Sequence, residues 1–257
     1  MKTLMITSVA LATLLAACGG SDAPAATDAA AVASVADDQE CGLTEEQIGD
    51  PTIAVVGSYM IVDGDLACEA TPEEAATYEL FTGLIPEEYR EVVVAFVGID
   101  TDESDGTDGA LQDIYDDNDD PTGERFIALD VTGASTELER TIVHEMGHSI
   151  FITAASDVPT GYAVDFNATF EPGVAYEDAP DEFVTEYAAS ADDGSEDMAE
   201  SWAMYVFGGT PFAGDADDDG ELDVVEPGTI AAEKVAFWDA YPELVQLRDD
   251  ILANAGF

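Results

Sequence analysis

The chain has only two histidines, His144 and His148, and they lie four residues apart in the segment ERTIVHEMGHSIFI, residues 139–152. Apolar residues recur through this stretch at the spacing of one helix face. They are Leu138, Ile142, Val143, Met146 and Ile150. Thr136, three residues before Glu139, can cap the start of such a helix. Because residues four apart project from the same side of a helix, the segment predicts one helix with both imidazoles on one face.

The rest of the chain predicts an α+β fold around this helix. The β-branched and aromatic runs 91–99 and 125–131 are typical of buried strands, and the acid- and glycine-rich stretch 100–120 predicts a loop. Helices are predicted over 71–81, which opens with a capping box from Thr71 and Glu74, over 195–207, and over 230–252 with an interruption at Pro242, whereas 153–185 is expected to be irregular. We therefore expect a single domain over residues 40–257, with a small mixed sheet and a helical C-terminal half.

Two imidazoles one helical turn apart suit two ligand positions of a tetrahedral zinc ion. Glu145 lies between them and can accept a proton from zinc-bound water at the open coordination position. The pattern H-E-x-x-H also occurs by chance, with histidines that are ordinary core or surface residues. Here both histidines of the chain fall in the motif, which favours a zinc site at His144 and His148.

The third zinc ligand is expected among the acidic residues, since there is no third histidine and the available cysteines are expected to be oxidised. Glu196 and Glu200 lie four residues apart on the predicted helix 195–207. One of them can bind zinc while the other accepts a hydrogen bond from a ligand histidine. Asp197 is expected to point elsewhere on that helix. These residues alone leave the choice between the two glutamates open.

HEMGH, taken with the downstream segment EYAASADDGSEDMAESWAMYV, resembles the gluzincins, zinc peptidases that pair H-E-x-x-H with a glutamate on a later helix. The closer resemblance is to gluzincins with a lethal-factor-like E-x-x-A-E box. The closing segment KVAFWDAYPELVQLRDDI is similar to that of bacterial zinc-binding metallopeptidase lipoproteins. The resemblance extends from about residue 125 to the end of the chain.

This resemblance implies a zincin-like catalytic domain that hydrolyses peptide bonds in a peptide or protein substrate. It implies that Glu196 completes the zinc site, that Glu145 activates the zinc-bound water, and that Tyr187 helps to stabilise the oxyanion. Glu200 then orients a ligand histidine. The alternative function is a non-catalytic surface lipoprotein that binds calcium and zinc, although a structural zinc would normally have four protein ligands.

A second metal site is predicted in the acidic segment DADDDGELDVVE, residues 215–226. Its spacing fits a twelve-residue calcium loop with glycine at the sixth position. The candidate calcium ligands are Asp215, Asp217, Asp219, Glu221, Asp223 and Glu226. So acidic a chain also produces such runs by chance, and Pro227 argues against a complete helix–loop–helix hand. The alternative is therefore an acidic surface segment.

The N-terminal residues predict export and a lipid anchor. Residues 1–17 have the length and apolar character of a signal peptide, and the sequence LAAC resembles a bacterial lipobox, with Cys18 as the lipidated residue. Residues 18–39 are poor in large apolar groups and are expected to be a flexible tether. An ordinary signal peptide is the alternative. We expect a cell-envelope lipoprotein, at the outer membrane or cell surface.

Without Cys18, the remaining cysteines are an even pair, Cys41 and Cys68, and a disulfide between them is expected in an oxidising compartment. Two unpaired buried cysteines are the alternative.

The charge of the chain excludes one class of partner and indicates a habitat. The 57 acidic residues outnumber the 6 basic ones, for a formal net charge of -51. Nucleic acid is therefore not expected as a partner. An acid excess spread over the whole chain is typical of proteins that stay soluble in concentrated salt, which indicates a salt-loving or marine source. A merely acidic secreted protein is the alternative.

Overall fold

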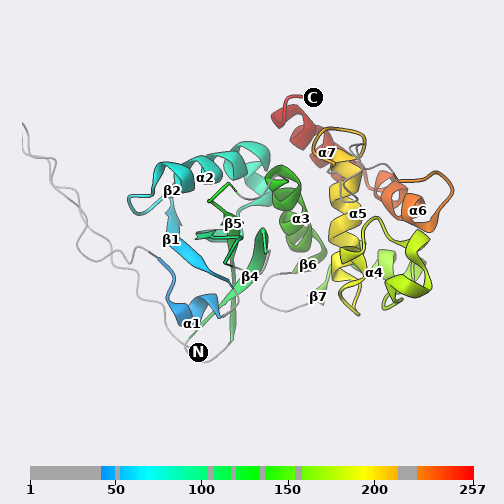
Figure 1. Cartoon of the computed structure of the whole chain (residues 1–257), viewed down its shortest axis with the longest axis horizontal. Helices are drawn as coiled ribbons and strands as arrows, with labels where there is room; N and C mark the ends of the chain where they lie inside the picture. Colours follow the sequence, from blue (N-terminus) through cyan, green and yellow to red (C-terminus); the bar gives the residue numbers. More distant parts are fainter. Residues whose placement is uncertain are drawn as a thin grey trace, which may run out of the picture. The chain divides into compact units, whose positions relative to one another are not determined.

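The computed structural model describes residues 42–49, 53–103, 107–116, 120–133, 137–153, 158–213 and 225–257. The chain divides into two units, Met1–Asp38 and Gln39–Phe257, and all of the described residues belong to the second. The expected signal peptide, tether and lipidated Cys18 lie outside them. The second unit has an α+β architecture built on a small mixed sheet, as expected (Figure 1).

The sheet has five strands in the order β2-β1-β3-β5-β4. These strands are β1 (Val55–Val62), β2 (Asp65–Leu66), β3 (Val93–Ile99), β4 (Gly109–Tyr115) and β5 (Pro121–Asp130). β3 and β5 pair in parallel, and the other neighbouring strands pair antiparallel. The two strands predicted from sequence correspond to β3 and β5, which are interior strands with mostly buried residues, whereas β1 was not predicted.

The prediction of a loop over residues 100–120 is partly wrong, because β4 forms within it. β4 has the sequence GALQDIY and lies at the edge of the sheet, where it pairs with β5 from Gly109 opposite Leu129 to Tyr115 opposite Pro121. Its few apolar side chains pack on different faces, Leu111 on the main core and Ile114 on a smaller core beneath the sheet. Pairing with a buried neighbour thus stabilises a strand whose own sequence is too polar to predict it.

The described residues also form α-helices: α1 (Glu45–Ile48), α2 (Pro72–Leu84), α3 (Leu138–Phe151), α4 (Gly161–Thr169), α5 (Ser195–Phe207), α6 (Ile230–Phe237) and α7 (Pro242–Asn254). The predicted helices correspond to α2, α3, α5, α6 and α7, the capping box at Thr71 and Glu74 is present, and Pro242 begins α7. The proposed cap of α3, Thr136, lies outside the described residues. Among the described residues, no helix is long and apolar enough to cross a membrane.

The prediction of an irregular segment over 153–185 is also partly wrong, because α4 forms within it. Phe166 of α4 stacks on Trp238, with ring centroids 5.3 Å apart and an interplanar angle of 8°. The ring of Phe237 lies 5.4 Å from the ring of Phe166 in an edge-to-face arrangement. These partners are about seventy residues away in the sequence. Distant aromatic packing therefore supports a helix that local sequence does not indicate.

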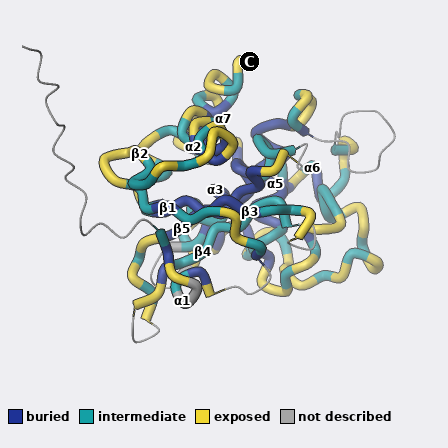
Figure 2. Tube along the Cα trace, turned by 60° about the vertical axis from the view of Figure 1, so that its left-hand side comes forward, coloured by how far each residue is buried: buried dark blue, intermediate teal, exposed yellow. Residues whose placement is uncertain are grey.

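The main core lies where α3 meets the sheet on one side and α5 on the other (Figure 1). Figure 2 shows buried residues concentrated along α3 and α5. Gly147 permits the close contact of these two helices, because a Cβ atom there would lie 3.2 Å from Cδ1 of Trp202 and 3.4 Å from Cα of Ala199. Such separations are tighter than most packed carbon atoms adopt. The glycine thus brings the histidine face of α3 against the first turns of α5.

The five basic residues of the described part all make internal contacts, and none is exposed. Arg125 pairs with Asp113, Arg140 with Glu200 and Lys234 with Asp197. Arg90 donates to the carbonyl of Ile85, and Arg248 lies over the ring of Tyr205. The exposed charges of the described residues are therefore negative.

Candidate metal centre

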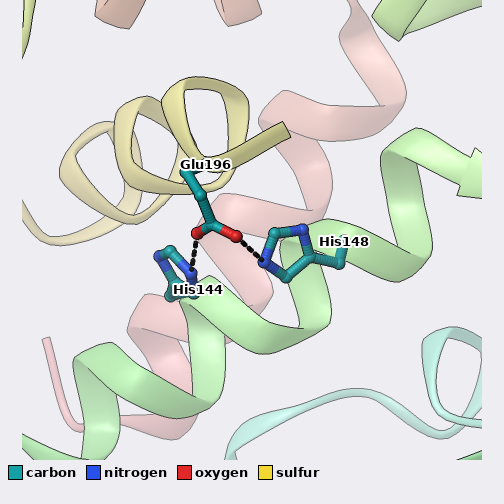
Figure 3. Close-up of side chains that lie close together, drawn as sticks. All are labelled: His144, His148 and Glu196. Atoms are coloured by element: carbon teal, nitrogen blue, oxygen red, sulfur yellow. Dashed lines mark ion pairs between the residues drawn. The ribbon is translucent and has the colours of Figure 1, made fainter. Parts of the chain in front are cut away.

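Glu196 lies between the two histidines of α3 (Figure 3). Its Oε2 is 3.1 Å from Nε2 of His144, and its Oε1 is 3.6 Å from Nε2 of His148. One ligand atom from each residue can be chosen such that all lie within 4.8 Å of one another. Within the described ranges, these three residues form the one group of this kind, and the group could hold a metal ion.

The donor set fits zinc in chemistry and in spacing. Two imidazole nitrogens and one carboxylate oxygen are common zinc ligands, and bonds of about 2.0–2.1 Å in a tetrahedron place ligand atoms roughly 3.3 Å apart. Glu196 approaches each histidine at a separation of this size, through Oε2 to His144 at 3.1 Å and through Oε1 to His148 at 3.6 Å. Oε2 of Glu196 is also buried without an aligned hydrogen-bond donor. Such an oxygen is suited to a metal bond.

Glu200 contacts the other nitrogen of His144. Its Oε1 lies 2.7 Å from Nδ1, and its Oε2 accepts hydrogen bonds from Arg140 and, at 2.7 Å, from the hydroxyl of Thr185. An ionised carboxylate only accepts, so Nδ1 carries a proton, and in the neutral ring Nε2 is then the nitrogen whose lone pair a metal ion would take. The geometry thus gives Glu196 and Glu200 different tasks, which the sequence alone left open.

Arg140 and Thr185 are site residues that sequence reasoning missed. Arg140 is one turn before His144 on α3, and it is one of only six basic residues in the chain. Those two facts could have indicated a partner for one of the acidic residues. Thr185 precedes α5 by ten residues and is brought to Glu200 only by the path of the chain.

Charge interactions link the histidines and the two glutamates. Burial alone would lower the pKa of His144, but the adjacent carboxylates of Glu196 and Glu200 raise it to about 10. Burial opposes ionisation of both glutamates, yet the adjacent histidines lower the pKa of Glu196 to about 2, and the hydrogen bond with His144 has the same effect on Glu200. Both carboxylates are therefore available as anions at neutral pH.

Glu145 lies beside this group and faces β4. Its Oε1 is 4.0 Å from Nε2 of His144, and only 8% of the residue is exposed. The pKa of Glu145 is raised overall, because burial and the charge of Glu196 raise it by more than the two histidines lower it. A Cβ atom at Gly109 would lie 3.2 Å from Cγ of Glu145, so the glycine leaves room for this side chain against the edge strand. A partly desolvated carboxylate in this position is a suitable general base.

Tyr187 lies beside His144, on the solvent-exposed side of the candidate metal ligands. It begins a short 3-10 turn, η4 (Tyr187–Ala189), is 57% exposed, and its ring centroid lies 5.8 Å from that of His144. Burial of the hydroxyl, followed by the negative charges of Glu196 and Glu145, raises the pKa of Tyr187 above its ordinary value. The phenol therefore stays protonated and can donate a hydrogen bond.

Two cavities meet at this point, and both are lined by Gly109, Glu145 and Tyr187. One, of about 330 Å³, continues along β4 to the buried ion pair of Asp113 and Arg125. The other, of about 360 Å³, continues toward Arg140 and Glu200. Among the described residues, β4 pairs only with β5, so its other edge borders the cavities, and the backbone of Leu111 on this strand forms a hydrogen bond with Glu145.

The remaining predicted site residues lie away from this centre. Asp197 points to the other side of α5, as expected, and pairs with Lys234. The calcium candidates from Asp215 to Asp223 lie outside the described residues, and Glu226 is exposed with its carbonyl accepting from Thr229. Cys68 is disulfide-bonded, while its predicted partner Cys41 lies outside the described part.

Comparisons of this chain with protein-family models, with curated proteins and with solved structures found no match.

Proposed function

We propose that this protein is a zinc-dependent metallopeptidase of the zincin-like type, anchored at the cell envelope through Cys18. The observation that carries the proposal is the combination of His144, His148 and Glu196 with Glu145 beside them. Structural zinc normally has four protein ligands, whereas the described residues supply three to this group, as in catalytic sites. The remaining position would be available to water or substrate.

Zinc bound there would supply a Lewis acid that polarises the substrate carbonyl and lowers the pKa of water. Glu145 would take the proton of the attacking water and pass it to the leaving amine. Tyr187 would donate a hydrogen bond to the oxyanion of the tetrahedral intermediate. Glu200 would hold His144 in the tautomer that offers Nε2, with Arg140 and Thr185 holding Glu200 in turn.

The edge strand β4 supports an extended peptide as substrate. A peptide laid along β4 can add as a further strand, with main-chain hydrogen bonds to the edge of β4 that faces the cavities. Because cavities extend in both directions from Glu145, residues on either side of the scissile bond would find room. The substrate would therefore be an unfolded or exposed segment of a protein.

The test is digestion of a denatured protein mixture by the purified protein loaded with zinc, with products identified by mass spectrometry. Glu145→Gln should abolish cleavage and retain the zinc, because the carboxylate acts on water and does not bind the metal. Glu171→Gln, the same change at an exposed position, is the matched control and should cleave normally. Equal cleavage by wild type and Glu145→Gln would refute the proposal.

A further inference from the structure

A buried ion pair lies directly behind the candidate zinc ligand Glu196. Nζ of Lys234 on α6 is 2.7 Å from Oδ2 of Asp197, the next residue after Glu196. Lys234 is 2% exposed and Asp197 is 5% exposed. The ammonium also lies 4.3 Å from the ring centroid of Phe183 and 5.9 Å from that of Phe170. The cation is thus enclosed by one carboxylate and two aromatic faces.

Burying these two charges adds little net stability to a fold. The desolvation of a buried pair commonly offsets its attraction, and well-packed apolar residues of similar volume are often as stable or more so. Oδ1 of Asp197 is also buried without a hydrogen-bond partner, which adds to the cost. Since the chain has only six basic residues, the use of one here points to a task that apolar packing would not perform.

Besides α3, two segments deliver side chains to the metal centre, and Lys234 contacts both of them. Asp197 belongs to the first turn of α5, which carries Glu196 and, one turn later, Glu200. Phe183 begins the segment that leads to Thr185 and Tyr187. At the exposed start of α5, where Gly194 is the cap residue, the carboxylate of Asp193 accepts hydrogen bonds from the backbone N–H and the hydroxyl of Ser195. The ion pair of Lys234 and Asp197 adds a second, buried connection to the same turn of the helix.

We propose that Lys234 is a positioning residue that holds Glu196 at the separation from His144 and His148 which a metal ion requires. The inference rests on the metal-binding part of the proposed function and does not require peptide hydrolysis. Metal–ligand bonds tolerate deviations of only about 0.2 Å, so a small displacement of the first turn of α5 lowers affinity. The aromatic rings and Asp197 restrict the ammonium in several directions at once.

The test is the zinc affinity of the purified protein, measured by competition with a chromogenic chelator. Lys234→Met should weaken zinc binding about tenfold or more, the range seen when partners of metal ligands are removed. It also leaves Asp197 buried and unpaired, so the protein should lose stability. The double variant Lys234→Met/Asp197→Leu removes both charges; it should recover the melting temperature but remain weak in zinc binding. If Lys234→Met does not fold, the zinc affinity of the double variant decides whether Lys234 positions Glu196.

Tyr59→Phe is the control for a general loss of stability. Tyr59 lies on β1, which is separated from β4 by β3 and β5, and the change removes its buried hydrogen bond to Glu74 on α2. This variant should melt earlier and bind zinc as wild type does. Wild-type zinc affinity in the double variant, or equal weakening by Tyr59→Phe, would overturn the positioning role of Lys234. A wild type that binds zinc but cleaves no peptide would refute only the peptidase proposal, and one that binds no zinc would refute both.

Discussion

Gly147→Ala tests how closely α3 and α5 approach behind the metal centre. The added Cβ would lie 3.2 Å from Cδ1 of Trp202 and 3.4 Å from Cα of Ala199, so the helices must separate by a few tenths of an ångström. Overpacking of this kind costs about 1–3 kcal/mol, while replacing a helical glycine by alanine gains roughly 0.8–1 kcal/mol. We expect a net loss of about 1 kcal/mol in the free energy of unfolding, or about 2–4 °C in melting temperature for a chain of this size.

The same displacement should lower zinc affinity about tenfold, because it moves the histidines of α3 away from Glu196 on α5 by more than metal bonds tolerate. Gly83→Ala is the matched control. Gly83 is an exposed glycine within α2, and a Cβ atom there would meet no heavy atom within 4 Å. It should gain the helix propensity of alanine and leave zinc binding unchanged. If Gly147→Ala is stabilising to the same degree and binds zinc normally, the close helix contact and its role in the site are wrong.

Four further predictions follow from the site and the charge distribution. Glu196→Ala should lower zinc affinity more than Glu200→Ala, because the first change removes a ligand and the second an orienting hydrogen bond; a chelator competition in which the order is reversed would exchange their roles. Hydrogen bonds outweigh burial and lower the pKa of Glu74, so its contribution to stability is present above its ordinary pKa of 4.5 and is lost as the pH falls through the lower folded value. Glu74→Gln should cost about 1–3 kcal/mol at neutral pH and flatten the melting profile between pH 5 and pH 3, roughly the window of this linkage; an unchanged profile would contradict it. The melting temperature should rise as sodium chloride is added toward about 1 M, where repulsion between acidic surface groups is screened, and a flat or falling curve would remove the halophilic interpretation. Calcium should stabilise the protein more than magnesium at matched ionic strength, and the variant Asp215→Ala/Glu226→Ala should abolish the difference; equal effects of both ions on wild type would identify the segment as ordinary acidic surface.

The sequence predicts those elements whose local pattern agrees with their tertiary environment. The helix with His144 and His148 has a regular apolar face, and the interior strands β3 and β5 are continuous apolar runs. The pair Glu196 and Glu200 could be found because the chain has no third histidine and because the second helix carries two glutamates four residues apart, whereas the choice of Glu196 came from the family resemblance. In each case the information lies within a stretch of about fifteen residues.

The elements that were missed depend on distant partners. β4 is held by its pairing with β5, and α4 by aromatic packing against Phe237 and Trp238. The contact of Thr185 with Glu200 depends on the path of an irregular segment. Lys234 is similar, because its position on α6 has no local relation to Asp197. Contacts between distant residues produce no hydrophobic periodicity in the sequence, so they cannot be predicted from a single sequence.

The internal placement of the basic residues has a consequence for the resistance of the protein to digestion. Trypsin cleaves after lysine and arginine, and none of the five such residues in the described part is exposed. Lys234 and Arg125, at 2% and 5% exposed, are the most deeply buried of them. A protease must bind an extended stretch of chain around a cleavage site, so cutting requires local or global opening of the fold. Tryptic cleavage at these five residues would therefore report how often the native structure opens. Cleavage after an arginine near a helix end should be detected earlier than cleavage after Lys234.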